Sequence, residues 1–235
     1  MSDARRRAII GSVVGLLVAA GIGALFAVWI QSTGDWRAGI PWERSFMQRI
    51  DRDVPMPVDW VMLSLPWLGT NLTVLPILVA VALWLWRAKS RGDLATELLA
   101  VSLGSLILNA VMKAGFGRPR PELWEHRGQF AWASYPSGHA IVCASVLFTA
   151  ALMLHRERGW RWPFYLAGTL LVVILYSRLY LGVHWPTDVI GGLLMGFVWL
   201  AGTQWAFLPF HNRRPTLAGR EPISAAHDRV PVAEA

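Results

Sequence analysis

The chain has 235 residues, of which 54% are hydrophobic and 16% are charged, with 14 tryptophans and a formal net charge of +7. Its apolar residues come in blocks long enough to cross a bilayer, which takes about 20 residues per helix, and the blocks lack the polar stripe of a soluble surface helix. The patterning therefore argues against a soluble domain. It also argues against a nucleic-acid binder, because the basic residues lie in short clusters between apolar runs and not on one surface.

Six apolar segments predict an all-α bundle of six transmembrane helices. They cover residues 8–30, 69–87, 94–112, 138–154, 162–180 and 188–208. The first follows three arginines and is too long for the apolar part of a signal peptide, so we expect a retained anchor helix. Its Gly11 and Gly15 are either a helix-packing face or an instance of the high glycine content of membrane helices.

The segments outside these spans predict two further features. Trp42–Ile50, in the long first loop, has apolar residues at helical spacing, which indicates a short amphipathic helix on the bilayer surface. The second span can also begin early, within Asp59–Leu68, so the sequence does not fix its first residue. We expect one membrane domain over residues 1–210, followed by a polar, disordered cytoplasmic tail over residues 211–235.

The distribution of Lys and Arg predicts the orientation. With the N-terminus inside, the inner segments hold 13 of the 22 basic residues, and each inner loop is short and basic, as the positive-inside rule expects. Both termini are then cytoplasmic. Three polar clusters, Lys113–Arg120, Ser137–His139 and Ser177–Asp188, all fall on the non-cytoplasmic face, although they were not used to set the topology.

Cationic side chains are the first chemical feature of these clusters. Lys113, Arg120 and Arg178 stand at predicted helix ends or just beyond them. A phosphate needs several donors around its oxygens, and Arg supplies a planar fork that engages two at once. The structural alternative is snorkelling to the interface, which we favour for Lys113 or Arg118 if either is considered alone.

The second cluster opens the fourth span. A helix N-terminus offers free N–H groups and a positive dipole to an anion. Ser137 can add a hydroxyl donor or serve as an ordinary N-cap, and Gly138 permits a close backbone approach. His139 can protonate a leaving oxygen. A serine hydrolase is less well supported, because the Gly-x-Ser-x-Gly elbow is absent.

The third cluster pairs His184 with Asp188. Pro186 suits the first turn of the sixth helix, so Asp188 falls in that turn, where the dipole favours a carboxylate. Asp188 can accept the Nδ1 proton of His184 and leave Nε2 as a nucleophile, which is the arrangement of a catalytic triad with histidine as the attacking group.

Metal binding is the competing use of these residues. His139, His184 and Asp188 could hold zinc, but the nearby cations would repel a metal and attract an anion. We therefore expect neither a metal nor another cofactor. The single cysteine, Cys143, excludes a cysteine-rich site and an internal disulfide, and we expect it to be a small buried side chain. The loop residues Glu122, Glu125 and His126 are interpreted as solvated.

Together the clusters resemble the signature of the type 2 phosphatidic acid phosphatase superfamily. The matching residues are Lys113-x6-Arg120-Pro121, Pro136-Ser137-Gly138-His139 and Ser177-Arg178-x5-His184-x3-Asp188. Their order and spacing agree with the family pattern without a departure at any catalytic position. The resemblance covers about residues 60–208.

The resemblance implies a metal-independent membrane phosphatase. The residues that it assigns to phosphate binding are Lys113, Arg120, Ser137, Gly138 and Arg178. It assigns His184 as the nucleophile that forms a phosphohistidine, with Asp188 orienting it. His139 would protonate the leaving group and then activate water.

We therefore expect hydrolysis of a lipid phosphate at the outer leaflet, because a headgroup can reach helix ends while its tails stay in the bilayer. Candidate substrates are undecaprenyl diphosphate, phosphatidic acid and phosphatidylglycerol phosphate. If the lipid is a bacterial carrier, the membrane is the inner membrane and the site is periplasmic. A lipid phosphotransferase would use the same site. A non-catalytic anion-binding or transport protein is less well supported, because the spans carry almost no polar residues.

Overall fold

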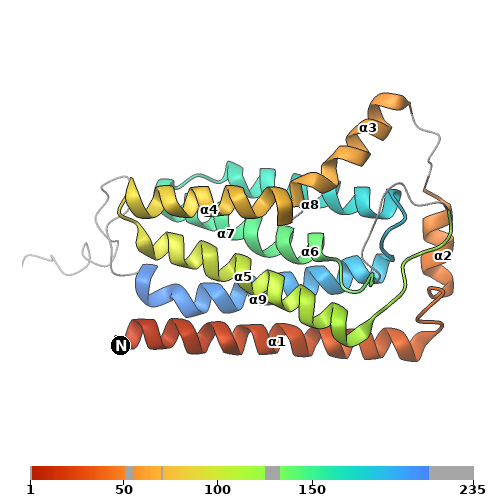
Figure 1. The fold of residues 1–235 in the computed structure, drawn as a ribbon, viewed down its shortest axis with the longest axis horizontal. Helices are drawn as coiled ribbons and strands as arrows, with labels where there is room; N and C mark the ends of the chain where they lie inside the picture. The colour runs from red at the N-terminus through yellow and green to blue at the C-terminus, as the bar shows by residue number, and fades with distance from the viewer. Residues whose placement is uncertain (1, 51–54, 70, 125–132, 212–235) are drawn as a thin grey trace, which may run out of the picture.

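The computed structural model describes residues 2–50, 55–69, 71–124 and 133–211, and every regular element within these ranges is a helix. Figure 1 shows the long helices side by side, with the N-terminus and the end of the last helix at the same end of the bundle. The predicted all-α fold is thereby confirmed. Residues 212–235, which include most of the predicted disordered tail, lie outside the described residues.

Each of the six predicted spans coincides with a helix. The helices are α1 (Asp3–Thr33), α4 (Asn71–Arg87), α5 (Gly92–Phe116), α6 (Gly138–Val142), α7 (Phe148–Arg158), α8 (Trp162–Tyr180) and α9 (Pro186–His211). A widened π-helical turn, η2 (Cys143–Leu147), joins α6 to α7 into one continuous helix, and Cys143 in it is buried and free. Five of the six are long and apolar enough to cross a membrane, whereas α4 is shorter, with 17 residues. The count of six membrane spans therefore stays a prediction.

Small residues allow α1 and α9 to approach closely. The buried positions of α1 recur about every four residues and are Ala4, Ala8, Gly11, Gly15, Ala19, Gly23, Ala27 and Ile30. A Cβ atom added at Gly15 would lie 3.1 Å from the Cα atom of Gly202, and one at Gly11 would lie 2.8 Å from the Cβ atom of Ala206. Of the two interpretations of the Gly11/Gly15 spacing, the helix-packing face is the one that the structure supports.

Buried ion pairs tie the helices together at the end of the bundle next to the N-terminus. Arg91 contacts Glu157 at 2.7 Å, and Glu97 contacts Arg156 at 3.2 Å and His211 at 2.8 Å. These pairs link α5 to α7 and α9. A charge buried in this way needs a partner, because desolvation is costly.

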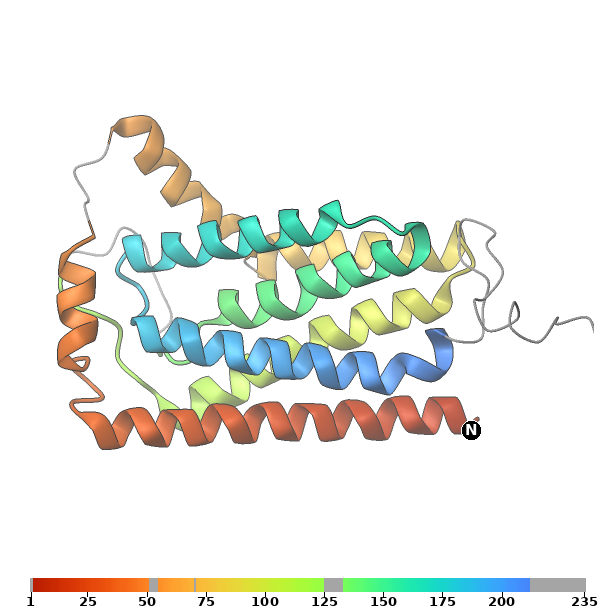
Figure 2. The same cartoon turned by 180° about the vertical axis from the view of Figure 1, so that it is seen from behind.

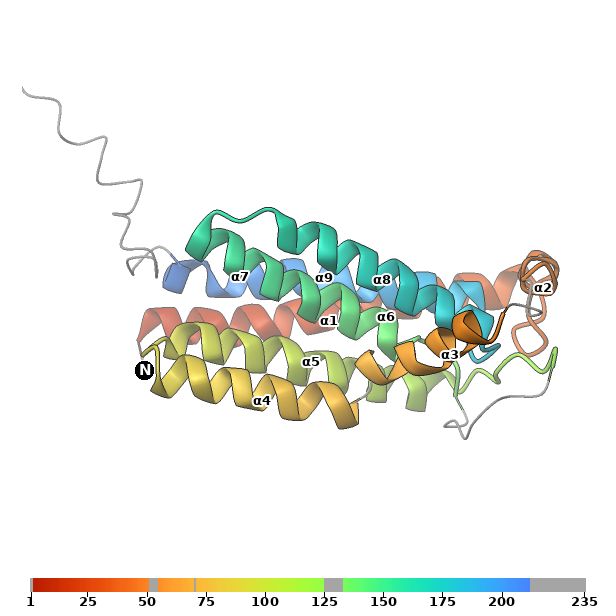
Figure 3. The same ribbon diagram turned by 90° about the horizontal axis from the view of Figure 1, so that it is seen from above.

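The opposite end carries the short helices α2 (Pro41–Gln48) and α3 (Met56–Ser64) (Figures 1 and 3). α2 lies across the end of the bundle where an amphipathic helix was predicted, with Trp42 and Phe46 exposed and Met47 buried. Glu43 of the same helix is fully buried. The helix therefore presents a carboxylate to the protein interior as well as apolar groups to its surroundings.

α3 and the following 3-10 turn η1 (Leu65–Gly69) form an element separate from α4, so the second span does not begin early as a continuous helix. No residue of α3 is buried. The hydroxyl of Tyr180, at the end of α8, donates to Asp59 at 2.7 Å and fastens α3 to the bundle.

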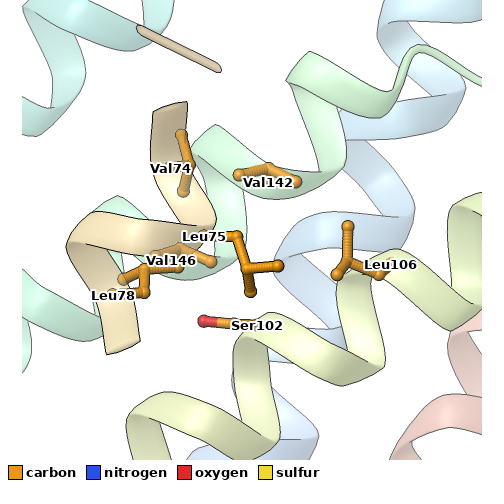
Figure 4. Close-up of a pocket in the computed structure, with 7 residues that line it drawn as sticks. All are labelled: Val74, Leu75, Leu78, Ser102, Leu106, Val142 and Val146. Atoms are coloured by element: carbon orange, nitrogen blue, oxygen red, sulfur yellow. The ribbon is translucent and has the colours of Figure 1, made fainter. Parts of the chain in front are cut away.

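A small cavity lies among α4, α5, α6 and η2 (Figure 4). The residues that line it are Val74, Leu75, Leu78, Ser102, Leu106, Val142 and Val146. Its volume of about 10 Å³ leaves room for about one water molecule. No charged side chain lines it, so it is a gap in helix packing and not a headgroup site.

The close approach of α1 and α9 predicts a specific sensitivity to side-chain size. Gly15→Leu should lower the free energy of unfolding by about 1–3 kcal/mol, because the new side chain meets the backbone of α9. Gly21→Leu is the matched control, since no atom lies within 4 Å of a Cβ atom there. The measurement is thermal unfolding of both purified variants in detergent, and equal melting temperatures would contradict this packing.

Candidate active site

The three polar clusters meet at the end of the bundle that carries α2 (Figures 1 and 2). α5 and α8 end there, and α6 and α9 begin there. Lys113 Nζ and an Arg120 amine both donate to the carbonyl oxygen of Ala133, at 2.5 and 3.3 Å. The other Arg120 amine donates to the carbonyl oxygen of Val183 at 2.5 Å. The loop after α5 is thereby fixed against the segment that carries His184.

Lys113, Arg120 and Arg178 form a cluster of like charges. Lys113 lies in the last turn of α5 and Arg178 in the last turn of α8, where Arg178 is 3% exposed. The charge of Arg120 acts on both of the other cations, and burial lowers the pKa of Arg120 itself. Like charges held together in a poorly hydrated site repel one another, and a bound anion relieves that repulsion. The cluster therefore has the electrostatics of a phosphate site.

The segment Ser137–His139 begins the helix formed by α6, η2 and α7. Ser137 stands at the N-cap position, but its side chain makes no capping hydrogen bond. Its Oγ atom is buried and has no hydrogen-bond partner in the described part of the chain. Ser137 therefore occupies the predicted N-cap position without the capping hydrogen bond, and its hydroxyl is available to a ligand. A buried hydroxyl without a partner calls for such an explanation.

The other two members of this segment face different neighbours. Gly138 lies against the side chain of Asn109, whose Oδ1 atom would be 3.0 Å from a Cβ atom added at Gly138. The Nε2 atom of His139 lies 3.0 Å from the carbonyl oxygen of Pro66 in η1. The turn before α4 thus lies directly beside the predicted general acid.

A tight turn between α8 and α9 presents His184. Gly182 has a φ of +68°, which favours glycine, and a side chain there would also collide with Trp124. The N–H of Val183 donates to the carbonyl oxygen of Arg178 at 3.2 Å and closes the turn. His184 follows directly, 3% exposed, and faces the cation cluster.

His184 and Asp188 are neighbours, as predicted, but the predicted hydrogen bond between them is not formed. The Nδ1 atom of His184 lies 3.7 Å from Asp188 Oδ2, beyond hydrogen-bond distance, and has no other partner among the residues that the structure describes. Asp188 Oδ2 instead accepts the backbone N–H of Trp185 at 2.8 Å. Catalytic hydrogen bonds are often long in an empty site and shorten when substrate binds.

The surroundings of His184 favour its neutral form. Burial, followed by the positive charges of Arg120, Lys113 and Arg178, holds the pKa of His184 well below its usual value of 6.5. A neutral imidazole keeps a lone pair for attack on an electrophile. His184 thus meets the electronic requirement for a nucleophile at neutral pH.

Two charged residues at this end were not predicted to belong to the site. Arg118 was interpreted as a snorkelling residue, and this is wrong, because its side chain is fully buried. It forms ion pairs of 2.8 Å with both Asp188 and Glu43. The sequence offers one weak signal for this network, namely that Glu43 is the single acidic residue in the amphipathic segment Trp42–Ile50.

The competing metal site receives no support from side-chain grouping. Within residues 2–50, 55–69, 71–124 and 133–211, no three His, Cys, Asp or Glu side chains are grouped as metal ligands. Glu122 is exposed, as expected for a solvated loop residue. Glu125 and His126 lie outside the described residues.

Comparison with known proteins gives consistent matches. The family model of the PAP2 superfamily matches residues 94–212. YbjG of Escherichia coli, assigned as an undecaprenyl-diphosphatase, is 33% identical over 157 residues, which are 64% of this chain and 75% of YbjG. Phosphatidylglycerophosphatase B of Bacillus subtilis is 31% identical over 145 residues, which are 59% of this chain and 70% of the relative.

A solved structure shares the fold. The crystal structure of a transmembrane PAP2-type phosphatidylglycerolphosphate phosphatase from Bacillus subtilis superimposes with a TM-score of 0.68 and 23% sequence identity. The match covers 87% of this chain and 98% of that one. At this identity the likeness concerns the arrangement of helices.

The lowered pKa of His184 predicts its titration. An unfolded histidine takes up a proton near pH 6.5, whereas folded His184 should stay neutral well below that pH. Above pH 6.5 the histidine is neutral in both states. As the pH falls below that value, the unfolded state takes up a proton that folded His184 does not, so the free energy of unfolding decreases. The measurement is a ¹⁵N NMR titration of histidine-labelled protein, with His184→Ala to assign the signal. A midpoint near pH 6.5 would contradict the described environment.

Proposed function

Because this chain belongs to the PAP2 superfamily, a family of phosphatases, we propose that it is an integral-membrane enzyme that hydrolyses a lipid phosphate monoester or diphosphate through a phosphohistidine. The observation that carries this proposal is the position of buried His184 beside three clustered cations. The matched relatives include an undecaprenyl-diphosphatase and a phosphatidylglycerophosphatase. Undecaprenyl diphosphate, phosphatidylglycerol phosphate and phosphatidic acid are the candidate substrates.

In the first step of the proposed reaction, Nε2 of His184 attacks phosphorus while the bond from phosphorus to the lipid-side oxygen breaks. His139 donates a proton to that departing oxygen. Fixed cations stabilise the charge that spreads over the phosphoryl oxygens in the transition state. The groups that supply this stabilisation are Lys113, Arg120 and Arg178, together with the hydroxyl of Ser137 and the backbone at Gly138.

In the second step, water attacks the phosphohistidine. His139, now deprotonated, accepts a proton from the water as its oxygen bonds to phosphorus and the bond to Nε2 of His184 breaks. Inorganic phosphate leaves, and both histidines return to their starting forms. Asp188 orients His184 throughout, because its carboxylate lies beside Nδ1. General acid–base help from His139 is worth roughly 10²–10⁴-fold in rate.

The surroundings of the site support a lipid substrate. α3 exposes Met56, Val58, Trp60 and Val61, and Trp67 of η1 is exposed beside them. The same η1 turn contacts His139 through Pro66. Exposed tryptophans of this kind favour the interface between water and lipid. We propose that the headgroup enters beside η1 while the acyl or prenyl chains remain in the bilayer.

The orientation is part of the proposal. The six spans, both termini in the cytoplasm and a site on the extracytoplasmic face follow from the distribution of Lys and Arg. The bundle supports this arrangement, since the N-terminus and the end of α9 lie at the end opposite the site (Figure 2). In a bacterium with two membranes, this orientation corresponds to an inner-membrane protein with a periplasmic site.

The first test of the function is phosphate release by the purified protein in detergent with EDTA present. The panel comprises undecaprenyl diphosphate, phosphatidic acid, phosphatidylglycerol phosphate and a water-soluble phosphate ester. We expect one lipid to be hydrolysed far faster than the others. His184→Ala should abolish release, and His139→Ala should lower kcat by roughly 10²–10⁴-fold.

Folding controls make this test decisive. Each inactive variant should keep the melting temperature of the unaltered protein. Loss of all activity in EDTA, restored by a divalent metal, would contradict a metal-independent mechanism. A phosphorylated acceptor in place of free phosphate would assign the site to phosphotransfer.

The orientation is tested separately by labelling with a membrane-impermeant thiol reagent in intact cells. In a Cys143→Ala background, Ala38→Cys places a thiol between α1 and α2, and Ala88→Cys places one between α4 and α5. Both alanines are exposed. We expect labelling of the first variant only, whereas labelling of the second variant only would reverse the topology.

A further inference from the structure

We infer that Arg118 and Glu43 are positioning residues for the catalytic pair, and that α2 is therefore a structural part of the active site. This inference rests on the proposed function, because Asp188 is the residue that they hold. The described hydrogen bonds of Arg118 and Glu43 are made with residues other than the proposed phosphate-binding side chains. Both act through the carboxylate of Asp188 and the first turn of α9.

Arg118 uses its guanidinium to join three segments of the chain. Its Nε atom donates to the carbonyl oxygen of Trp36 at 2.9 Å. One terminal amine donates to Thr187 Oγ1 at 2.7 Å and to Asp188 Oδ1 at 2.8 Å. The other amine donates to Glu43 at 2.8 Å. These contacts fix the planar fork in one orientation.

Two aromatic rings complete the enclosure of Arg118. The centre of its guanidinium lies 4.8 Å from the ring of Trp36 and 5.4 Å from the ring of Trp185. Its side chain is fully buried. A buried guanidinium above an aromatic face gains a cation–π interaction, so the rings stabilise the charge that faces Asp188.

Glu43 holds the other side of the same network. Its Oε2 atom accepts the N–H of Ile40 at 3.0 Å as well as the Arg118 amine. Its Oε1 atom accepts both the backbone N–H of Thr187, at 3.1 Å, and the Thr187 hydroxyl, at 2.5 Å. A carboxylate from α2 thus holds the residue that precedes Asp188.

The consequence for catalysis lies in the two oxygens of Asp188. Oδ1 is fixed by Arg118, while Oδ2 is fixed by the N–H of Trp185 and faces His184 Nδ1 at 3.7 Å. The carboxylate therefore cannot rotate without losing a charge-assisted hydrogen bond. Holding Oδ2 beside Nδ1 favours the tautomer of His184 that leaves Nε2 free for attack.

A purely stabilising role is the alternative, and the chain offers a matched control for it. Arg91 forms a comparable buried pair with Glu157 at 2.7 Å, but at the other end of the bundle. Removing either arginine leaves a buried carboxylate without its charged partner, which is destabilising. Only removal of Arg118 should also affect the site, so the two variants separate loss of stability from loss of positioning.

The experiment compares Arg118→Gln with Arg91→Gln in the full-length protein. For Arg118→Gln we expect kcat to fall about 10–100-fold. This is the range typical for replacing a residue that orients a functional side chain through a hydrogen bond. The KM and the affinity for inorganic phosphate, measured by ³¹P NMR, should change little because the phosphate-binding cations remain. Arg91→Gln should lower the melting temperature but leave kcat unchanged.

The ¹⁵N shifts of His184 give a readout that does not depend on activity. With saturating inorganic phosphate, the unaltered protein and Arg91→Gln should show the Nδ1–H tautomer, whereas Arg118→Gln should show a mixture. Glu43→Gln keeps the shape of the side chain. Its proportion of the Nδ1–H tautomer of His184 should lie between those of the unaltered protein and Arg118→Gln. It also serves as the test if Arg118→Gln does not fold.

The outcomes distinguish the two proposals. If the unaltered protein releases phosphate from no substrate in the panel, the proposed function fails. The positioning inference is then tested by the tautomer of His184 alone. If kcat and the His184 ¹⁵N shifts of Arg118→Gln and Glu43→Gln both equal those of Arg91→Gln, the positioning inference is wrong. Equal loss of phosphate affinity and kcat in Arg118→Gln would also overturn it, since that would assign Arg118 to the phosphate site.

Discussion

The repulsion among Lys113, Arg120 and Arg178 is the physical constraint on which the site depends. Three positive side chains meet at one end of an apolar bundle, where water screens their charges poorly. Holding these like charges together costs free energy, and the binding of an anion lowers that cost. Burial and, after it, the same three charges lower the pKa of His184, so the cations proposed to bind phosphate also help to keep the proposed nucleophile neutral.

The bundle holds this charge in place because Lys113 and Arg178 lie in the last turns of two different helices, and Arg120, in the loop after α5, is hydrogen bonded to the carbonyl oxygen of Val183. Small residues bring α1 and α9 into backbone contact, and buried ion pairs tie the far ends of α5, α7 and α9 together. The network of Glu43, Arg118 and Asp188 plays the corresponding role at the site end. The first loop, through α2, is thereby connected to the turn that presents His184.

Much of the fold, and the gathering of the predicted site residues at one end, could be predicted from the sequence, because apolar length and motif spacing are local properties. The helices coincide with the six apolar segments, and the predicted site residues lie at one end. The role of Arg118 could not be predicted in this way. Its partners, Glu43 and Asp188, are 75 and 70 residues away in the chain, and an arginine beside a predicted span is typical of snorkelling. The unformed bond between His184 and Asp188 depends on the backbone of Trp185, which a motif does not describe.

The most direct test of the central claim is chemical trapping of the phosphoenzyme. Purified protein is mixed with ³²P-labelled lipid phosphate, denatured within milliseconds in alkali and digested for peptide mapping. The mechanism predicts label on the peptide that contains His184, stable in alkali and released by acid, as expected for a phosphorus–nitrogen bond. It should accumulate in His139→Ala with a substrate whose leaving group needs no protonation, because the water step is then slow. Turnover without label in either protein, or label on a serine, would contradict His184 as the nucleophile.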